Sequence, residues 1–272
     1  MSARRDGARP PERDLRSLQR HASPALEDPT LLLAFEGWND AGEAASLAAR
    51  YVADELGTAP LADLDPDDFF DFTVQRPLVR IDEGGARSVE WPSLELRFGS
   101  LRPGRDVVVG IGPEPHLRWR EYGDLVAGYA AELGVRRVVL LGAYLADVVY
   151  SRPVAISGFA SNPEWLGELS VQASRYEGST GIVGVLGQRF QDEGLDVVSL
   201  WAGLPHYIVA TPNPRGALAL LQTLGACLEL KLDDAPLMAQ AAEYERRTNE
   251  LVASDPELAE YVRELKRREF AQ

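Results

Sequence analysis

Histidine and carboxylate side chains recur in three loops of this sequence, and each loop follows a short apolar run. The loops cover residues 36–40, 112–116 and 201–207, and they contain two of the three histidines of the chain. Because imidazole exchanges protons near neutral pH, histidines beside carboxylates could carry out general acid–base catalysis. The side chains that could line one crevice are Glu36, Trp38, Asn39, Asp40, Glu114, His116, His206 and Tyr207.

Each of these residues also has a purely structural interpretation. Asp40 precedes a helical pattern and can act as its N-cap, with Glu43 three residues on as in a capping box. Glu114 and His116 precede another helix, where a carboxylate meets the helix dipole favourably. His206 could lie in a turn with a buried, hydrogen-bonded ring. Taken one at a time, the residues favour these structural roles, and only their convergence supports catalysis.

The sequence lacks complete catalytic and metal-binding motifs. It contains no H-E-x-x-H, no H-x-x-x-H, no paired cysteines and no G-x-S-x-G. Phosphate-binding loops and pyridoxal phosphate sites both need a lysine, and the only two are Lys231 and Lys266, neither of which follows a glycine-rich loop. Cys227 lies in an apolar run and is predicted to be a core residue. We therefore expect no metal and no cofactor, and we assign no catalytic residue.

Alternating strands and helices must position these loops. Apolar runs at residues 30–35, 106–111, 138–141 and 195–200 are typical of buried strands, and helical patterns follow most of them. Residues 61–98 differ, because they contain short strands and a hairpin with the turn Gly84-Gly85. These patterns predict a three-layer α/β/α sandwich with a mostly parallel mixed sheet. In such sheets ligands bind at the carboxyl ends of the strands, where the three loops lie.

The chain divides by composition into three parts. Residues 1–28 are rich in arginine and poor in apolar side chains, so we predict a disordered basic arm. Residues 29–232 hold the alternating pattern and form the predicted α/β domain. Residues 233–272 are polar and helical only, with a sparse apolar stripe. We predict that they form a C-terminal helical hairpin, lying on the domain or on a neighbouring subunit.

The charge of the chain limits its classes of partner. The segment from Met1 to Leu26 has a net charge of +3, so the remainder carries −17 of a total of −14. Such an acidic body disfavours nucleic acid and anionic membranes, which are bound through Lys and Arg. No apolar stretch approaches the roughly 20 residues of a membrane helix, and the single cysteine excludes an internal disulfide framework. We expect a cytoplasmic protein with neither nucleic acid nor a membrane as partner.

Four motifs in a fixed order resemble a known family, the proteasome-assembly-chaperone-2-like proteins of actinobacteria and archaea. The resemblance extends over roughly residues 31–230, most of the chain. No single motif is diagnostic of catalysis, but the series is specific. The motifs are Phe35-Glu36-Gly37-Trp38-Asn39-Asp40-Ala41-Gly42, Gly112-Pro113-Glu114-Pro115-His116 with Trp119, Gly181-Ile182-Val183-Gly184, and Trp201 through Pro205-His206-Tyr207.

The resemblance implies a fold similar to nucleoside phosphorylases and assembly into homo-oligomers, with a trimer as the candidate state. It implies no established activity for the prokaryotic members. The eukaryotic relatives bind proteasome α-subunits during ring assembly without catalysis. Some prokaryotic relatives are labelled ATP-grasp enzymes, but the scarcity of lysine counts against that activity here. The helices after Asp233 extend beyond the family pattern and could serve oligomerisation.

Two hypotheses of function follow. The first is a non-catalytic protein-binding or assembly factor of the chaperone kind, linked to the proteasome and homo-oligomeric, with proteasome subunits as candidate clients. The alternative is an enzyme or binder of a small nucleoside-like or anionic metabolite, held in a crevice at the strand carboxyl ends. The sequence favours the first, and a structure distinguishes them by showing whether the three loops share one pocket.

Overall fold

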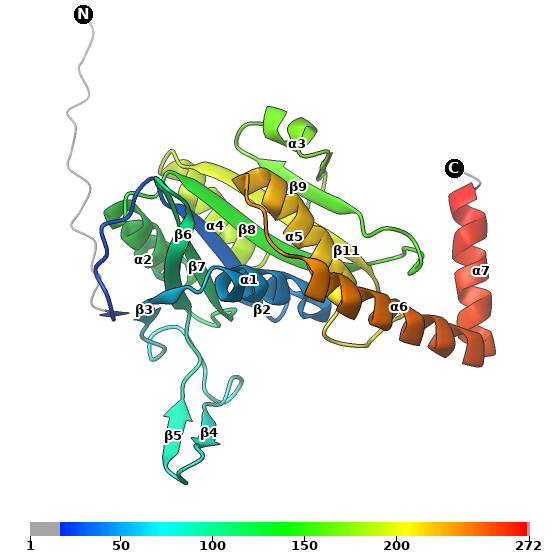
Figure 1. Ribbon diagram of the computed structural model, residues 1–272, viewed down its shortest axis with the longest axis horizontal. Coiled ribbons are helices and arrows are strands. Elements are labelled where there is room, and N and C mark those ends of the chain that lie inside the picture. Colours follow the sequence, from blue (N-terminus) through cyan, green and yellow to red (C-terminus); the bar gives the residue numbers. More distant parts are fainter. Residues whose placement is uncertain (1–16, 271–272) are drawn as a thin grey trace, which may run out of the picture.

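The structure, a computed structural model, describes residues 17–270. Nine strands form one sheet in the order β1-β3-β6-β7-β2-β8-β11-β9-β10 (Figure 1). Its four central strands run parallel, so their carboxyl ends share one edge. These strands are buried on both faces, which explains their continuous apolar sequences. They are β7 (Arg105–Pro113), β2 (Thr30–Glu36), β8 (Arg137–Ala146) and β11 (Asp196–Pro205).

Antiparallel pairing is found toward both sides of the sheet, so the predicted mixed α/β sheet is confirmed. On one side β6 (Glu95–Arg102), β3 (Ala59–Leu64) and β1 (Leu18–Arg20) follow β7. On the other side β9 (Ile156–Ala160) pairs antiparallel with β11, and the short β10 (Gln172–Ala173) runs parallel to β9. The helix α3 (Glu164–Glu168) lies between these two strands in the chain.

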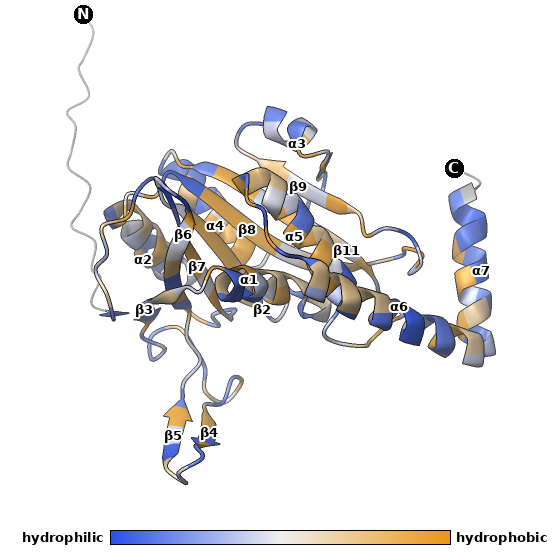
Figure 2. Ribbon diagram, in the orientation of Figure 1, coloured by the Kyte–Doolittle hydropathy of each residue, from blue (hydrophilic) through white to orange (hydrophobic). Residues whose placement is uncertain are grey.

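Helices cover both faces of the sheet and give three α/β/α layers. Leu31, Leu33 and Phe35 of β2 pack with α2 (Trp119–Glu132) and α4 (Ile182–Asp192). The alternate residues Leu32 and Ala34 pack with α1 (Ala44–Glu55) and α5 (Pro214–Leu228). Figure 2 shows the hydrophobic residues concentrated in the central strands. Within residues 17–270, no helix is long and apolar enough to cross a membrane.

A two-stranded ribbon projects from the sheet between β3 and β6. It consists of β4 (Leu78–Ile81) and β5 (Arg87–Glu90), which pair only with each other among the described strands. The hairpin predicted around Gly84-Gly85 is therefore confirmed. Figure 1 shows the ribbon standing clear of the body on two connecting segments.

The predicted basic arm needs a correction. Residues 1–16 lie outside the described residues, but residues 18–20 form β1 and are not disordered. Leu18 is buried in the main core, and Arg20 forms an ion pair with Glu132 while lying over the ring of Tyr129. Burial of one leucine and pairing of one arginine explain why this segment is ordered.

The two C-terminal helices, α6 (Ala235–Ser254) and α7 (Pro256–Phe270), meet at a sharp bend and diverge (Figure 1). They do not form the helical hairpin predicted for residues 233–272. Only Asp255 separates them, whereas antiparallel helices need a loop of about two to five residues. The Asp255 carboxylate caps α7 by accepting a hydrogen bond from Leu258 N at 3.1 Å. Helix α7 instead packs against the loops after β8 and β11 through Val262 and Leu265.

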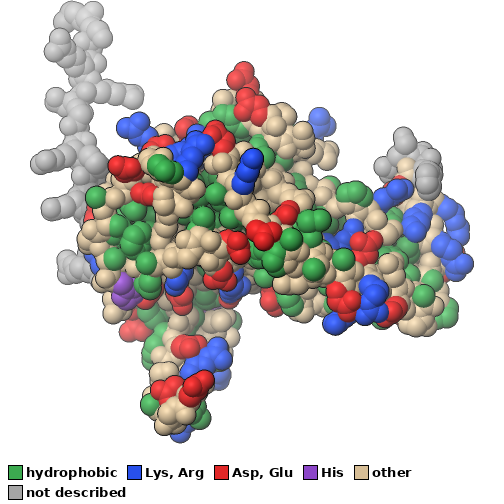
Figure 3. All heavy atoms as spheres, viewed as in Figure 1, with side chains coloured by type: hydrophobic (Ala, Val, Ile, Leu, Met, Phe, Trp, Pro, Cys, Tyr) green, Lys and Arg blue, Asp and Glu red, His purple; other side chains and the backbone are tan. Residues whose placement is uncertain are grey.

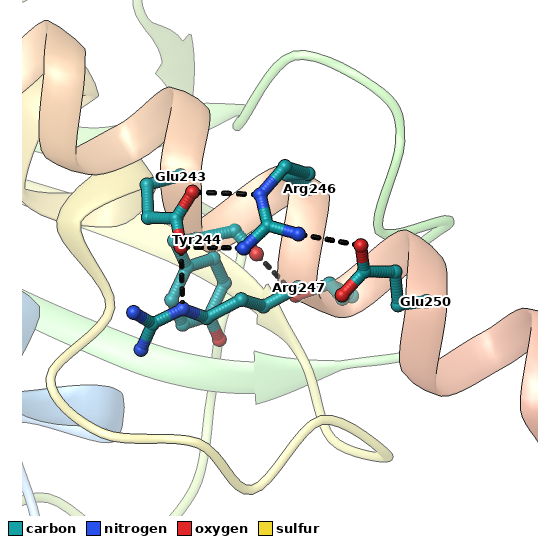
Figure 4. Close-up of polar contacts among 6 residues, drawn as sticks. Glu243, Tyr244, Arg246, Arg247 and Glu250 are labelled. Carbon is teal, nitrogen blue, oxygen red and sulfur yellow. Dashed lines mark hydrogen bonds and ion pairs between the residues drawn. The ribbon is translucent and has the colours of Figure 1, made fainter.

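The outer surface of α6 carries a chain of ion pairs (Figure 4). Glu243 lies between Arg246 and Arg247, at 2.7 Å from each, and Arg246 also binds Glu250. Hydrogen bonds from the two arginines lower the pKa of Glu243 to about 2. Such exposed pairs contribute little to stability individually.

Candidate functional site

The loop after β2 is buried and holds the start of α1. Asp40 is 5% exposed, and its Oδ1 accepts hydrogen bonds from Ala45 N at 2.6 Å and Ser46 N at 3.3 Å. The predicted cap is therefore present, but α1 begins at Ala44 after a short 3-10 turn. Glu43 adopts a left-handed conformation and makes no capping bond, so the predicted capping box does not form. Burial raises the pKa of Asp40, against the opposing effect of these hydrogen bonds.

The loops after β2 and β7 meet through Asn39 and Glu114. Asn39 Nδ2 donates to Glu114 Oε1 at 2.8 Å, and Ile182 N donates to the same oxygen at 2.7 Å. Glu114 thus occupies the positive end of α4, where a carboxylate is stabilised by free amides and the helix dipole. Gly181 lies against this pair, since a Cβ there would stand 2.3 Å from Asn39 Oδ1. Two loops and a helix are joined here by one carboxylate.

His116 faces away from Glu114. Its Nδ1 accepts a hydrogen bond from Asp71 N at 3.1 Å, and its ring packs edge-on against Phe70 at 5.8 Å. The histidine therefore fixes the segment that precedes the ribbon. It has a structural partner on each side and does not join the Asn39–Glu114 pair.

His206 and Tyr207 belong to a third group, beneath α7. His206 Nε2 lies 2.9 Å from Asp147 Oδ1 and 2.9 Å from the hydroxyl of Tyr261. The Tyr207 hydroxyl accepts from Tyr150 N and donates to the carbonyl oxygen of Val148, both at 2.9 Å. These contacts tie the loop after β8 to α7. These contacts could not be predicted from the sequence, because Asp147 and Tyr261 come from parts of the chain that lack a motif.

Glu36 and Trp38 complete the predicted set. Glu36 forms an ion pair with Arg50 of α1, and Trp38 is 61% exposed. The eight predicted residues thus lie in separate places along the edge. Their side chains meet in two pairs: Asn39 with Glu114 through a hydrogen bond, and His206 with Tyr207 through edge-on packing of the rings at 5.5 Å. Among residues 17–270, no group of three or more His, Cys, Asp or Glu side chains is arranged to hold a metal ion.

A cavity of about 180 Å³ opens next to the third group, and none of the eight predicted residues lines it. Its walls come from the loop after β8, the end of β11, the start of α5, and the two C-terminal helices. Arg215 lines it together with the charged residues Arg152 and Glu269, and its guanidinium donates to the carbonyl oxygens of Tyr150 and Arg152. The arginine therefore fastens the loop after β8 to α5. Sequence reasoning missed this residue because no motif surrounds it.

Apolar side chains are exposed at the same carboxyl edge. Leu145 near the end of β8 is 59% exposed, and Val209 after β11 is 87% exposed. Exposed apolar groups that gather on one side of a protein are typical of interaction surfaces. We call this group the edge patch: Trp38, Leu117, Tyr144, Leu145 and Val209. It extends over both faces of the edge, because Tyr144 and Leu145 are consecutive in β8 and point to opposite faces of the sheet. The topology of the sheet brings these residues to the same edge, since each lies at or just beyond the end of a central parallel strand.

Comparison with known proteins gives a consistent set of relatives. The model of the PAC2 family matches residues 34–252, which include most of α6 and exclude α7. The crystal structure of a PAC2 family protein from Streptomyces avermitilis is 40% identical, with a TM-score of 0.80, over 86% of this chain and all of that one. A proteasome-assembly chaperone homologue from Mycobacterium tuberculosis is also 40% identical, with a TM-score of 0.78, over 86% and 99%.

More distant relatives share the fold. A Corynebacterium glutamicum protein of unknown function is 25% identical, with a TM-score of 0.84, over 94% of this chain and 98% of that one. An archaeal proteasome activator from Pyrococcus furiosus is 19% identical, with a TM-score of 0.68, over 86% and 97%. No curated protein is significantly similar in sequence.

Proposed function

Because the chain belongs to the PAC2 family, we propose that it is a non-catalytic, chaperone-like assembly factor that binds proteasome α-subunits. The observation that carries the proposal is the contrast at the carboxyl edge of the sheet. The polar residues there are engaged in capping and loop contacts, whereas the apolar residues of the edge patch face solvent. A surface of this kind suits the burial of another protein better than the binding of a polar metabolite.

The proposal has three further parts. A cytoplasmic location is supported by composition, since a lone cysteine offers no internal disulfide. Self-association, with the trimer as one candidate state, is supported by exposed apolar surfaces away from the edge patch. Likeness to the nucleoside phosphorylase fold is supported by the three layers around a mixed sheet, and superposition on such an enzyme tests it.

A charge placed in the edge patch should weaken client binding. Leu145→Asp is expected to weaken binding to purified proteasome α-subunits at least about tenfold, because a carboxylate at the centre of an apolar contact must be desolvated. The matched control is Leu251→Asp on α6, where the leucine is 46% exposed and lies outside the edge patch. Calorimetry or biolayer interferometry measures both affinities. Absence of binding by the wild-type protein, or equal losses in both variants, would refute the proposal.

The alternative function requires the eight predicted residues to share one crevice, and they lie apart. We therefore expect nucleosides, phosphate and amino acids to leave the midpoint of thermal unfolding unchanged. A true ligand at a hundredfold its Kd would add about 2.7 kcal/mol of stability. A rise in the midpoint of thermal unfolding that depends on ligand concentration would support the alternative function.

A further inference from the structure

The ribbon of β4 and β5 has no cover from the rest of the described chain. All eight of its strand residues are exposed, and four of them are apolar. Leu78 and Val79 are each 54% exposed, Ile81 is 66% exposed and Val89 is 52% exposed. An isolated two-stranded ribbon is only marginally stable in water, whereas three or more strands with an apolar face are stable. The ribbon thus needs further strands on its apolar face or edge to form a stable sheet.

Its apolar residues lie mainly on one face. Val79 pairs with Val89, and Ile81 pairs with Arg87, so these four side chains point the same way. By the alternation of the strand, Trp91 follows on that face. The opposite face holds the ion pair between Arg80 and Glu90. Figure 3 shows hydrophobic side chains on the ribbon beside acidic and basic ones.

The outer edge of β5 has free hydrogen-bonding groups. Asp82 N donates to Ala86 O at 3.0 Å, which fixes the alternation of bonds along the ribbon. Ser88 and Glu90 therefore direct their N–H and C=O groups toward β4, whereas Arg87 and Val89 direct theirs away. No other described strand pairs with this edge. Such an edge is a template for another strand.

We propose that the ribbon is a dimerisation element, in which β5 pairs antiparallel with β5 of a second copy about a two-fold axis at Val89. The proposal rests on the self-association named above and is independent of client binding. The pairing joins two ribbons into a four-stranded sheet. Val79, Ile81 and Val89 of both copies then form one continuous apolar face, which supplies the stability that a single ribbon lacks.

The charges of β5 complement themselves in this register. Arg87 comes to lie opposite Trp91 of the second copy, where a guanidinium can stack on the indole. Ser88 comes to lie opposite Glu90, so no like charges face each other. Arg87 has no ion pair within the described chain. In this arrangement the Arg87 of each copy gains Trp91 of the other copy as a partner. Pairing through β4 is poorer, because the equivalent axis at Val79 sets Ile81 opposite Pro77, which has no N–H to donate.

The number of subunits tests the proposal. A two-fold contact between ribbons requires an even number of subunits. This holds whether the α/β domains make no other contact with each other or also form the trimer expected from the resemblance. Val89→Pro removes the outward N–H without touching the bonds to β4, and proline is tolerated at such edge positions. Light scattering after size exclusion should show that this variant halves the mass of the wild-type assembly.

Val79→Pro is the matched control, because Val79 lies opposite Val89 and directs its N–H to the other edge of the ribbon. It should keep the wild-type mass, as should Leu145→Asp, which tests client binding only. Circular dichroism and the unfolding midpoint verify that each variant is folded. A monomeric or odd-numbered wild-type assembly, an unchanged mass for Val89→Pro, or a halved mass for Val79→Pro would overturn the proposal.

Cross-linking gives an independent test. In a Cys227→Ser background, Val89→Cys places two thiols opposite each other with a Cα separation of about 5.5 Å, within the range of a disulfide. Mild oxidation should convert most of the protein to a covalent dimer on a non-reducing gel. Val79→Cys in the same background should stay uncrosslinked, and equal behaviour of the two variants would contradict the proposed axis.

Discussion

Gly181→Ala is expected to lower the stability of the protein by about 3 kcal/mol, which is about 6–12 °C in the midpoint of thermal unfolding for a chain of this size. The added methyl group would stand 2.3 Å from Asn39 Oδ1 and 2.6 Å from Glu114 Oε1. Neither oxygen can move freely, because Asn39 is fully buried and Glu114 caps α4. Relief of the clash therefore requires α4 to shift away from both loops.

Gly123→Ala in α2 provides the control. There the nearest atom to an added Cβ is 3.7 Å away, an ordinary contact, and alanine favours a helix more than glycine does. Its midpoint should stay the same or rise slightly. Thermal unfolding followed by circular dichroism compares the two variants. Equal midpoints would show that the Asn39–Glu114 junction does not hold α4 in place.

The sequence predicted the parts of the candidate site that depend on neighbouring strands. Asn39 and Glu114 follow β2 and β7, and parallel neighbours bring their carboxyl ends together, so their meeting could be expected. The bond from Glu114 to Ile182 could not, because it depends on how α4 settles over the sheet from 68 residues away. The direction of His116 was equally inaccessible, since its partner at residue 71 lies in an irregular segment.

The same division holds for the fold. The Gly84-Gly85 turn and the residues around it predicted a hairpin, because turn chemistry is local. Its separation from the body was not predictable, because this depends on the long-range pairing of β3 with β6 beside it. The bend between α6 and α7 was predictable in part. The capping role of Asp255 is local, but the direction of α7 is set by its contacts with the loop after β8.

Asp40→Ala is expected to lower stability by about 2 kcal/mol, the combined effect of a lost helix cap and buried amides without acceptors. Ala45 N and Ser46 N are buried beneath the loop, so water cannot replace the carboxylate readily. Asp40→Asn keeps an oxygen for Ala45 N and should remain within about 1 kcal/mol of the wild type. Denaturant unfolding at neutral pH compares the three proteins, and equal losses in both variants would exclude capping as the role of Asp40.

The pH dependence of stability in the wild type and in Asp40→Asn tests whether the Asp40 charge is buried. Burial raises the pKa of Asp40 above its ordinary value of 3.8, so the folded protein holds the proton more tightly than the unfolded chain does. The stability this provides is fully present below pH 3.8 and is lost as the pH rises through the folded pKa. Asp40→Asn cannot titrate, so its stability relative to the wild type should increase over that window and then level off. A relative stability that instead falls as the pH rises would mean that hydrogen bonds, rather than burial, dominate the energetics of Asp40.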